Sequence, residues 1–253
     1  MKHFLIVTND GKDKEYKVTD HVKNLLEQAG MTCVICEKDE KKQIIREAIP
    51  KELDCAIVIG GDGSFIEAAR VLEERDIPIL GINMGTLGYL TEVELNHIDE
   101  AIEKVVNGEY SLEERMMLAG EFQNGDSNVA LNDIVVSRKG ALRVIHFRLF
   151  VNGELLNSYK ADGIILSTPT GSTAYNLSAG GPIVEPTASL IVITPICSHA
   201  LNTSSIVLSS EDEIMIEIGE GRNGSVEEVS VAFDGADMVT LFTGDRMKIH
   251  KAC

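Results

Sequence analysis

The clearest candidate for chemistry is the stretch GGDGS at residues 60–64, which follows the apolar run CAIVI (55–59) and precedes a helical pattern over 64–75. Its glycines, which leave room for a phosphate group to approach backbone N–H groups, are Gly60, Gly61 and Gly63. A helix that starts here adds the positive end of its dipole. The three glycines and the helix start therefore predict a phosphate-binding loop.

The acid in this loop needs a separate explanation, because a carboxylate repels phosphate. Asp62 could hold Mg²⁺, or it could accept a proton from an attacking hydroxyl group. Phosphoryl transfer asks a protein mainly to position the nucleophile and to neutralise charge, and one acid suffices to orient the alcohol. The alternative is an ordinary strand-to-helix turn that happens to contain an aspartate.

A second candidate is the hydroxyl-rich stretch STPTGSTAYNLSAGG at residues 167–181. It follows the strand-like run ADGIIL, which contains Asp162, and it ends in two glycines. Short hydroxyl side chains beside small residues can bind ribose, amide or base edges, and Tyr175 offers an aromatic face for stacking. The alternative is a helix whose first turn is capped by serine or threonine.

A third candidate is LNDIVVSR at residues 131–138, where Asn132 and Asp133 interrupt an apolar strand. Adjacent residues of a strand point to opposite faces, so at least one of the two needs a buried partner. An amide next to a carboxylate can read adenine or ribose hydroxyls. A turn or bulge at the end of the strand is the alternative.

Composition sets the class of protein. The 253 residues, 44% hydrophobic and 25% charged, are ordinary for a soluble globular chain, and no apolar run reaches the length of a membrane span. The net charge of −17 opposes binding to nucleic acid or to anionic membranes. Five scattered cysteines predict a reducing compartment, and CVIC at 33–36, with no second ligand pair nearby, favours buried thiols over a zinc or redox site. We expect a cytoplasmic protein.

The order of elements predicts two domains. Residues 1–110 alternate strand and helix patterns, which implies a parallel sheet with helices on its faces. The expected strands are at 3–8, 32–37, 55–61 and 77–83. One expected helix ends near residue 30, and the other three span 40–49, 64–75 and 97–109. Residues 111–253 are β-rich and rich in turn signals, with a two-residue hairpin at VNGE (151–154), and predict an antiparallel, sandwich-like domain. About the last 20 residues could instead return to the first domain.

The three candidates occur together with a fourth motif, GINMGTLGYLTE (81–92). No G-x-G-x-x-G follows a strand and no G-x-x-x-x-G-K-[ST] occurs, which excludes the usual dehydrogenase and P-loop patterns. In this order, GGDGS, GINMGTLGYLTE, LNDIVV and DGIILSTPTGSTAYNLSAGGPIV resemble the bacterial NAD kinase family over nearly the whole chain. The resemblance implies transfer of the γ-phosphoryl group of ATP to the 2′-hydroxyl of the adenosine ribose of NAD, with Mg²⁺ on the donor, in a homodimer or homotetramer.

The resemblance also assigns residues. It makes Asp62 the proton acceptor and residues 60–63 the phosphate loop, and it gives Asn132 and Asp133 the ribose and nicotinamide side of NAD. Asp162 would bind the substrate amide. The resemblance implies further substrate-binding residues, which are Tyr89, Arg143, Lys160, Thr173, Ala174, Tyr175, Asn176, Leu177 and Ser178. In the family, the basic residues, here Arg143 and Lys160, sometimes come from a neighbouring subunit. No residue is assigned as a metal ligand.

The chain departs from the family pattern in places. Ser64 stands where threonine is commoner, Asp133 where glutamate is, Ser204 and Ser205 where Arg-Pro is, and Ala236 where glutamine is. Ser64 keeps a hydroxyl at the helix start, and Asp133 shortens the reach by one methylene. The changes at 204–205 and at 236 concern NAD affinity and regulation rather than the reaction. Two other functions stay open at this point. The first is a lipid or sugar kinase that shares GGDG, and the second is a dinucleotide sensor without activity.

Overall fold

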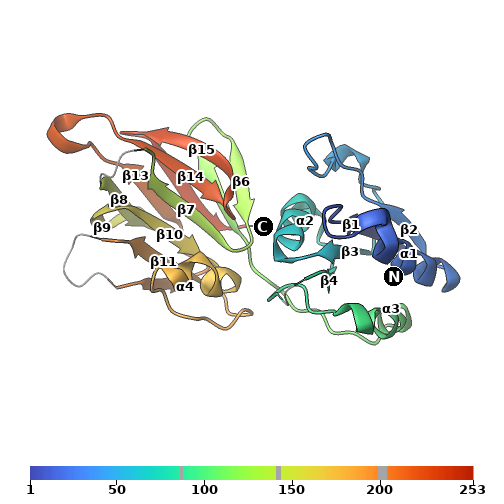
Figure 1. Ribbon diagram of the computed structural model, residues 1–253. Helices are drawn as coiled ribbons and strands as arrows, with labels where there is room; N and C mark the ends of the chain where they lie inside the picture. Colours follow the sequence, from blue (N-terminus) through green and yellow to red (C-terminus); the bar gives the residue numbers. More distant parts are fainter. Residues whose placement is uncertain (86–87, 141–143, 199–203, 253) are drawn as a thin grey trace. The chain divides into compact units, whose positions relative to one another are not determined.

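The chain forms two units, Met1–Leu112 and Glu113–Cys253, each with its own hydrophobic core. The computed structural model describes residues 1–85, 88–140, 144–198 and 204–252, without the side chain of Asp237. Figure 1 shows the first unit in blue to green and the second in green to red.

The first unit is built on a four-stranded parallel sheet in the order β2-β1-β3-β4. Its strands are β1 His3–Thr8, β2 Thr32–Ile35, β3 Cys55–Gly60 and β4 Ile79–Asn83. All six residues of β3 are buried, as expected for a parallel strand that is covered on both faces. The predicted α/β class is confirmed for this half.

Helices cover both faces of that sheet. Alternate residues of β1 point to opposite faces and therefore pack against different helices. Phe4 and Ile6 pack with α1 (Lys17–Gln28) and α3 (Ile98–Asn107), whereas Leu5 and Val7 pack with α2 (Asp62–Leu72). Short 3₁₀ turns lie at Lys14–Tyr16, Arg46–Ala48, Glu73–Arg75 and Leu95–His97. The helix α2 begins two residues earlier than the pattern predicts, so Asp62 is its first residue.

The predicted helix over 40–49 is wrong. Asp39 Oδ1 accepts hydrogen bonds from the backbone N–H groups of Lys41 (2.9 Å) and Gln43 (2.8 Å), and Lys42 has a positive φ of 64°. A short aspartate side chain that binds nearby N–H groups competes with helix formation. The segment therefore turns back, and only the 3₁₀ turn Arg46–Ala48 is helical.

The thiols of the first unit are free. Cys33 and Cys36 are partly buried and Cys55 is buried. Burial raises the pKa of Cys36 to about 11 and that of Cys55 to about 12, so both stay protonated at neutral pH. The interpretation of CVIC as buried thiols fits these surroundings.

The second unit is a sandwich of two six-stranded antiparallel sheets, which confirms the predicted class of this half. One sheet has the order β12-β11-β10-β7-β14-β15, and the other β6-β5-β16-β13-β8-β9. The first sheet comprises β7 Asp133–Arg138, β10 Gly163–Ser167, β11 Leu190–Ile196, β12 Ile206–Ser209, β14 Glu228–Phe233 and β15 Ala236–Phe242. The second comprises β5 Leu118–Phe122, β6 Ser127–Ala130, β8 Ile145–Val151, β9 Glu154–Ala161, β13 Ile214–Ile218 and β16 Arg246–Lys251.

Between β10 and β11 the chain forms a 3₁₀ turn, Thr170–Thr173, and the one-turn helix α4, Tyr175–Ser178. A further 3₁₀ turn is Arg222–Gly224. The predicted hairpin at VNGE is confirmed, because Val151 pairs with Glu154 while Asn152 and Gly153 have positive φ values of 51° and 83°.

The end of the chain lies in the second unit. β16 pairs with β13 and β5, and the backbone N–H of Ala252 binds the carbonyl of Met117 over 2.9 Å. β16 and Ala252 therefore belong to the second unit. None of the described helices is long and apolar enough to cross a membrane.

Candidate active site

The glycine loop lies at the carboxyl end of β3, where the chain enters α2. Gly61 caps the helix in an extended conformation (φ −135°, ψ −175°), and no side chain caps the first turn. The first N–H groups of a helix have no partner within the helix. An uncapped helix start of this kind is suited to an anionic ligand.

Asp62 is held by the segment that follows β4. Its carboxylate accepts hydrogen bonds from the backbone N–H groups of Tyr89 (2.8 Å), Leu90 (3.2 Å) and Thr91 (3.2 Å). The Tyr89 bond goes to Oδ2 and the other two go to Oδ1. A Cβ built on Gly88 would lie 2.0 Å from Oδ1, so this close approach requires glycine.

A side-chain relay completes this arrangement. The hydroxyl of Thr91 donates to Oδ1 of Asp62 over 3.1 Å, and Nδ2 of Asn83 donates to the same hydroxyl over 3.0 Å. Thr91 is fully buried and Asn83 nearly so. Oδ1 thus accepts three hydrogen bonds from the protein and Oδ2 accepts one, which leaves Oδ2 the freer oxygen.

In the second unit, the residues around Asn132 and Asp133 are held by a turn distant in sequence. The carboxylate of Asp234 accepts the backbone N–H groups of Leu131 (2.9 Å), Asn132 (2.7 Å) and Asp133 (3.1 Å). Asp234 and Gly235 form the turn between β14 and β15, with positive φ values of 52° and 73°. Aspartate followed by glycine is a usual turn sequence, but nothing local indicates the role of the aspartate side chain.

Asp133 is the first residue of β7 and is only 5% exposed. Burial, together with the nearby charge of Asp234, raises the pKa of the Asp133 carboxyl to about 7. The group can therefore be protonated or ionised near neutral pH, and it can donate or accept a hydrogen bond.

The hydroxyl-rich segment packs directly on the Asn132 backbone. The hydroxyl of Thr168 donates to the carbonyl of Leu131 (2.6 Å), and its backbone N–H donates to the carbonyl of Asn132 (2.9 Å). A Cβ on Gly171 would lie 2.0 Å from that Asn132 carbonyl oxygen. The second and third sequence candidates thus form one cluster.

The predicted residues of this segment face in different directions. Asn176 is fully buried, and its Nδ2 donates to the carbonyls of Ser172 and Pro182 (both 3.0 Å) while its Oδ1 accepts from Thr194 (2.7 Å). Its side chain therefore holds the segment in place. Tyr175 and Leu177 are 46% and 43% exposed, Ser178 is exposed, and Thr173 and Ala174 are partly buried.

Asp162 lies at the opposite end of the paired strands β10 and β7, and Lys160 lies on β9 of the other sheet. β10 pairs with β7 so that Ser167 faces Asp133 and Gly163 faces Ser137, and Asp162 precedes Gly163. At a rise of about 3.3 Å per residue, the Asp162 end is about 17 Å from the Asp133 end. Asp162 contacts Arg138 (3.5 Å), Lys160 is exposed, and Arg143 lies outside the described residues.

Comparisons with known proteins agree with this fold. The sequence matches the ATP-NAD kinase N-terminal domain over residues 15–110 and the ATP-NAD kinase C-terminal domain over residues 131–253. An NAD kinase of Lachnospira eligens is 45% identical, with 100% of this chain and 92% of that protein covered. An NAD kinase of Lachnoclostridium phytofermentans is 44% identical, with 100% and 91% covered.

This chain belongs to the NAD kinase family. Solved structures show the same fold at lower identity. Yeast NADH kinase complexed with NADH has a TM-score of 0.88 at 23% identity, covering 100% of this chain and 81% of that one. An NAD kinase from Archaeoglobus fulgidus in complex with ATP has a TM-score of 0.78 at 24% identity, covering 99% and 90%.

Several residues that shape the candidate site of this NAD kinase family member were not predicted from the sequence. Thr91 and Gly88 lie in the motif at 81–92, in which Tyr89 was the residue predicted to bind substrate. The side chain of Tyr89 is 68% exposed, and its backbone N–H makes the contact with Asp62. The run of small residues in GINMGTLGYLTE was the available signal, since glycines allow close backbone approach. Nothing local marked Asp234 as a partner of residues 131–133.

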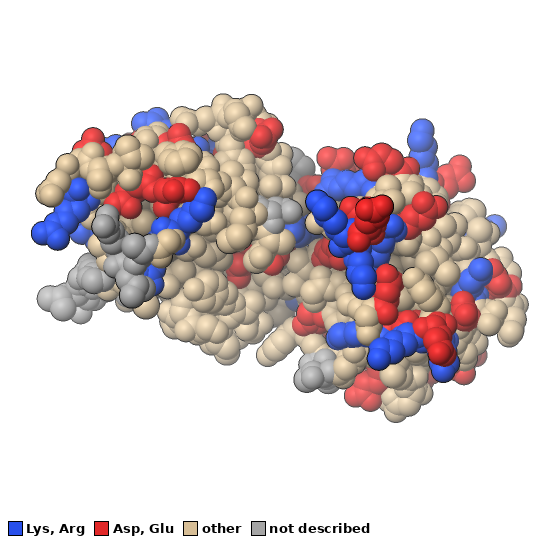
Figure 2. All heavy atoms as spheres, turned by 45° about the horizontal axis from the view of Figure 1, so that its top comes forward, with Lys and Arg blue, Asp and Glu red and all other residues tan. Residues whose placement is uncertain are grey.

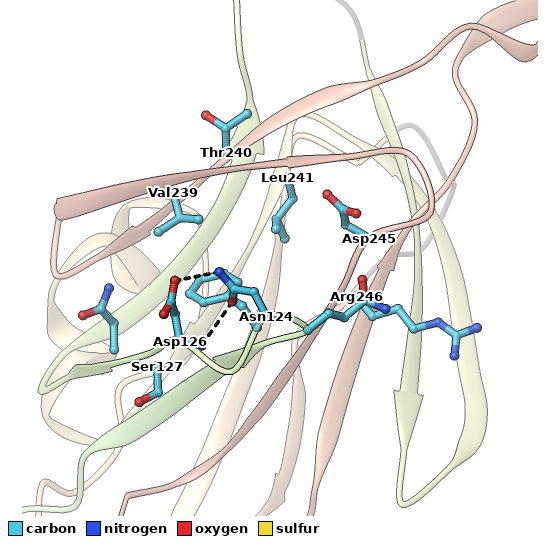
Figure 3. A pocket seen from close by; sticks show the side chains of 11 residues that line it. Asn124, Asp126, Ser127, Val239, Thr240, Leu241, Asp245 and Arg246 are labelled. Atoms are coloured by element: carbon cyan, nitrogen blue, oxygen red, sulfur yellow. Dashed lines mark hydrogen bonds between the residues drawn. The ribbon is translucent and has the colours of Figure 1, made fainter.

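A separate hollow of about 500 Å³ lies in the second unit, beside the turn between β5 and β6 (Figure 3). Its lining includes Phe122, Asp126, Leu241 and Arg246, and Asn124 donates to Asp126 over 2.6 Å. None of the predicted site residues lines it. Within the described residues, no group of three or more His, Cys, Asp or Glu side chains could hold a metal ion.

Proposed function

We propose that this chain transfers the γ-phosphoryl group of ATP to the 2′-hydroxyl of the adenosine ribose of NAD, giving NADP and ADP. Phosphorylation of NAD to NADP is the reaction of the NAD kinase family, to which the chain belongs. The observation that carries the proposal is the carboxylate of Asp62, held by four hydrogen bonds at the open start of α2.

Asp62 is proposed as the proton acceptor. The ribose 2′-oxygen forms a bond to the γ-phosphorus, the bond from that phosphorus to the bridging oxygen breaks, and ADP leaves. The proton of the 2′-hydroxyl passes to Asp62 and then to solvent. Oδ2, which accepts only the Tyr89 N–H among the described contacts, is the oxygen we assign to this task.

The glycine loop is proposed to bind the phosphates of the donor. Gly61 and Gly63 lie at the start of α2, where the helix dipole favours the negative charge. Gly60 is the buried last residue of β3, and a Cβ on it would lie 2.8 Å from Cβ of Ser64. Because no described carboxylate cluster is built to hold a metal, we propose that Mg²⁺ arrives bound to the donor phosphates. The ion would neutralise the charge that develops on the transferred group.

The second unit is proposed to bind the dinucleotide. Asn132 and Asp133 would hold the ribose and nicotinamide side, and the exposed ring of Tyr175 would stack on a base. Thr173, Ala174, Leu177 and Ser178 would line the adenine side, with Asn176 fixing their segment through its buried hydrogen bonds.

Asp162, at the other end of β10, and the exposed Lys160 on β9 suit a contact with a dinucleotide bound by a neighbouring subunit, and we propose the same for Arg143. The chain would then act as a homodimer or homotetramer. Edge strands with exposed apolar side chains support assembly, since Leu155 and Leu156 on β9 are 55% and 44% exposed. The free thiols support a cytoplasmic location.

The test is NADP formation from NAD, ATP and Mg²⁺, followed with an NADP-specific dehydrogenase, with Asp62→Asn as the paired variant. We expect the variant to lose activity by about 10²-fold or more while it still binds NAD. Full activity in the variant would refute the role of Asp62. Tight dinucleotide binding without turnover by a folded wild type, with polyphosphate as donor also failing, would indicate a sensor, and phosphorylation of a lipid or sugar instead would indicate a different kinase.

A further inference from the structure

The residues named so far supply no full positive charge at the proposed donor site. The chain carries a net charge of −17, and Asp62 adds a carboxylate at the place where a triphosphate would bind. Backbone N–H groups and a helix dipole supply only partial positive charge. A triphosphate site usually includes at least one full cation from the protein.

The structure puts one cationic side chain at the glycine loop. A Cβ built on Gly61 would lie 2.8 Å from Nζ of Lys12, and one built on Gly85 would lie 3.3 Å from the same atom. The ammonium group thus reaches the backbone that follows β3 and the backbone that follows β4. Those strands are parallel neighbours, so their carboxyl ends share one edge of the sheet.

The turn that carries Lys12 is tied to this edge. Oδ1 of Asn9 accepts the backbone N–H groups of Gly11 (3.1 Å) and Lys12 (3.3 Å), and Nδ2 of Asn9 donates to the hydroxyl of Ser64 (3.0 Å). The buried Asp13 anchors the other side by accepting the backbone N–H of Thr19 (2.8 Å). The base of the lysine side chain is therefore fixed against the first turn of α2.

Some lysines, Lys12 among them, have no carboxylate partner in the described part of the chain, whereas others have one, as in Lys139–Glu228 (2.6 Å) and Lys248–Glu213 (2.7 Å). Figure 2 likewise shows Lys and Arg side chains interspersed with Asp and Glu on the visible face. Over the ranges that the structure describes, no carboxylate lies within 4.0 Å of the Lys12 ammonium. Lys12 is exposed to solvent.

We propose that Lys12 binds the phosphate oxygens of the phosphoryl donor. The proposal rests on the proposed function, because it names the residue that neutralises the donor at that site. The lysine undergoes no covalent change; its ammonium donates hydrogen bonds to oxygens that gain charge during transfer. Its side chain would contribute to donor binding and not to binding of NAD.

Binding is the first test, because it does not depend on turnover. Isothermal calorimetry with inorganic tripolyphosphate and with Mg²⁺-ATP would compare the wild type, Lys12→Met, Lys12→Arg and Lys14→Met. Lys14 is an exposed lysine two residues away and removes the same charge when changed. We expect Lys12→Met to weaken the binding of both ligands by about tenfold or more, because hydrogen bonds to charged phosphate oxygens are lost. Lys14→Met should match the wild type, and Lys12→Arg should lie between them.

Steady-state kinetics separates this inference from the proposed function. The expected result is a raised KM for ATP in Lys12→Met with the KM for NAD within about twofold of the wild type. Wild-type turnover with unchanged ATP binding in Lys12→Met would refute the role of Lys12 and keep the kinase. If tripolyphosphate binding depends on Lys12 but no NADP forms, the role of Lys12 in phosphate binding is kept and the proposed kinase activity is refuted. Equal losses in Lys12→Met and Lys14→Met, or no tripolyphosphate binding by the wild type, would also overturn the inference.

Discussion

The hydroxyl of Thr91 donates a hydrogen bond to Oδ1 of Asp62 over 3.1 Å, and it is itself held by Nδ2 of Asn83. This relay fixes the carboxylate in one orientation. Because Oδ1 is already bound three times by the protein, the carboxylate can present only Oδ2 without breaking contacts. Orientation of this kind costs nothing at the moment of reaction, which is why it can contribute to rate.

Thr91→Val keeps the shape of the buried side chain and removes its hydroxyl, whereas Thr91→Ser keeps the hydroxyl. We expect Val to lower kcat about tenfold, because one hydrogen bond to a charged group is lost, and Ser to retain most of the activity. The KM for NAD and for ATP should change little. Steady-state kinetics with a melting curve for each variant would check this, and equal kcat values for the Val and Ser variants would contradict it.

Gly88→Ala tests the close approach itself. The new Cβ would lie 2.0 Å from Oδ1 and 2.5 Å from Cγ of Asp62, so the segment must shift and its N–H bonds must lengthen. Misplacement by about 1 Å can cost 10²-fold, so we expect kcat to fall by about that factor. Tm should fall as well.

A double variant supplies the control for this collision. Asp62→Ala removes the carboxylate that Gly88→Ala would meet, so adding Gly88→Ala to that background should cost little further stability. Melting curves of the two single variants and the double variant would measure the coupling. If the two losses simply add, the collision is not the cause.

Local sequence signals were sufficient for the elements that carry the glycine loop. The buried strand β3 and the helix pattern after it predicted the strand-to-helix turn that contains Asp62, because strand, turn and helix are formed by consecutive residues. The contacts that orient Asp62 join residues 27 to 29 positions apart. Those that hold Asn132 and Asp133 join residues 101 or 102 positions apart. Such partners are set by the tertiary fold, and a single sequence does not show them.

One wrong prediction has a local cause. The pattern over 40–49 looked helical because its apolar residues are suitably spaced, but the side chain of Asp39 binds the backbone of the following turn. The role of Asn176 in binding stays a prediction, and the sequence did not show that its side chain is buried while those of Tyr175 and Leu177 are exposed. In a helix of one turn, sequence periodicity is too short to tell the two faces apart.

Asp133 makes stability depend on pH. Its native pKa of about 7 lies above the ordinary value of 3.8, so the native state holds a proton that the unfolded chain releases between about pH 4 and pH 7. The free energy of unfolding therefore falls as pH rises through this window, by about 1.4 kcal/mol per unit at most. The asparagine side chain of Asp133→Asn cannot ionise, so this variant should not show that fall in the free energy of unfolding.

We therefore expect Asp133→Asn to be more stable than the wild type at pH 8, by a few kcal/mol at most, and much closer to it at pH 5. Thermal or urea unfolding of both proteins at the two pH values, without dinucleotide, would measure the difference. The same stability difference at pH 5 and pH 8 would show that Asp133 does not titrate between them.

Asp234 is expected to support both the stability of the second unit and its binding of NAD. Asp234→Ala leaves the N–H groups of residues 131–133 without their acceptor, which costs about 1–3 kcal/mol, and the positive φ of 52° disfavours alanine further. Asp234→Asn keeps an acceptor oxygen and tolerates that conformation, so its loss should be smaller.

Because the same N–H groups position Asn132 and Asp133, the KM for NAD should rise in Asp234→Ala while the KM for ATP stays near the wild-type value. Loss of the Asp234 charge in Asp234→Asn should also lower the pKa of Asp133 somewhat, since that charge helps to raise it. Burial would still hold the Asp133 pKa above 3.8, so the pH dependence of unfolding should shrink without disappearing. Kinetics and unfolding at two pH values for both variants would test these points together, and a loss confined to ATP would contradict the assignment of this turn to the dinucleotide side.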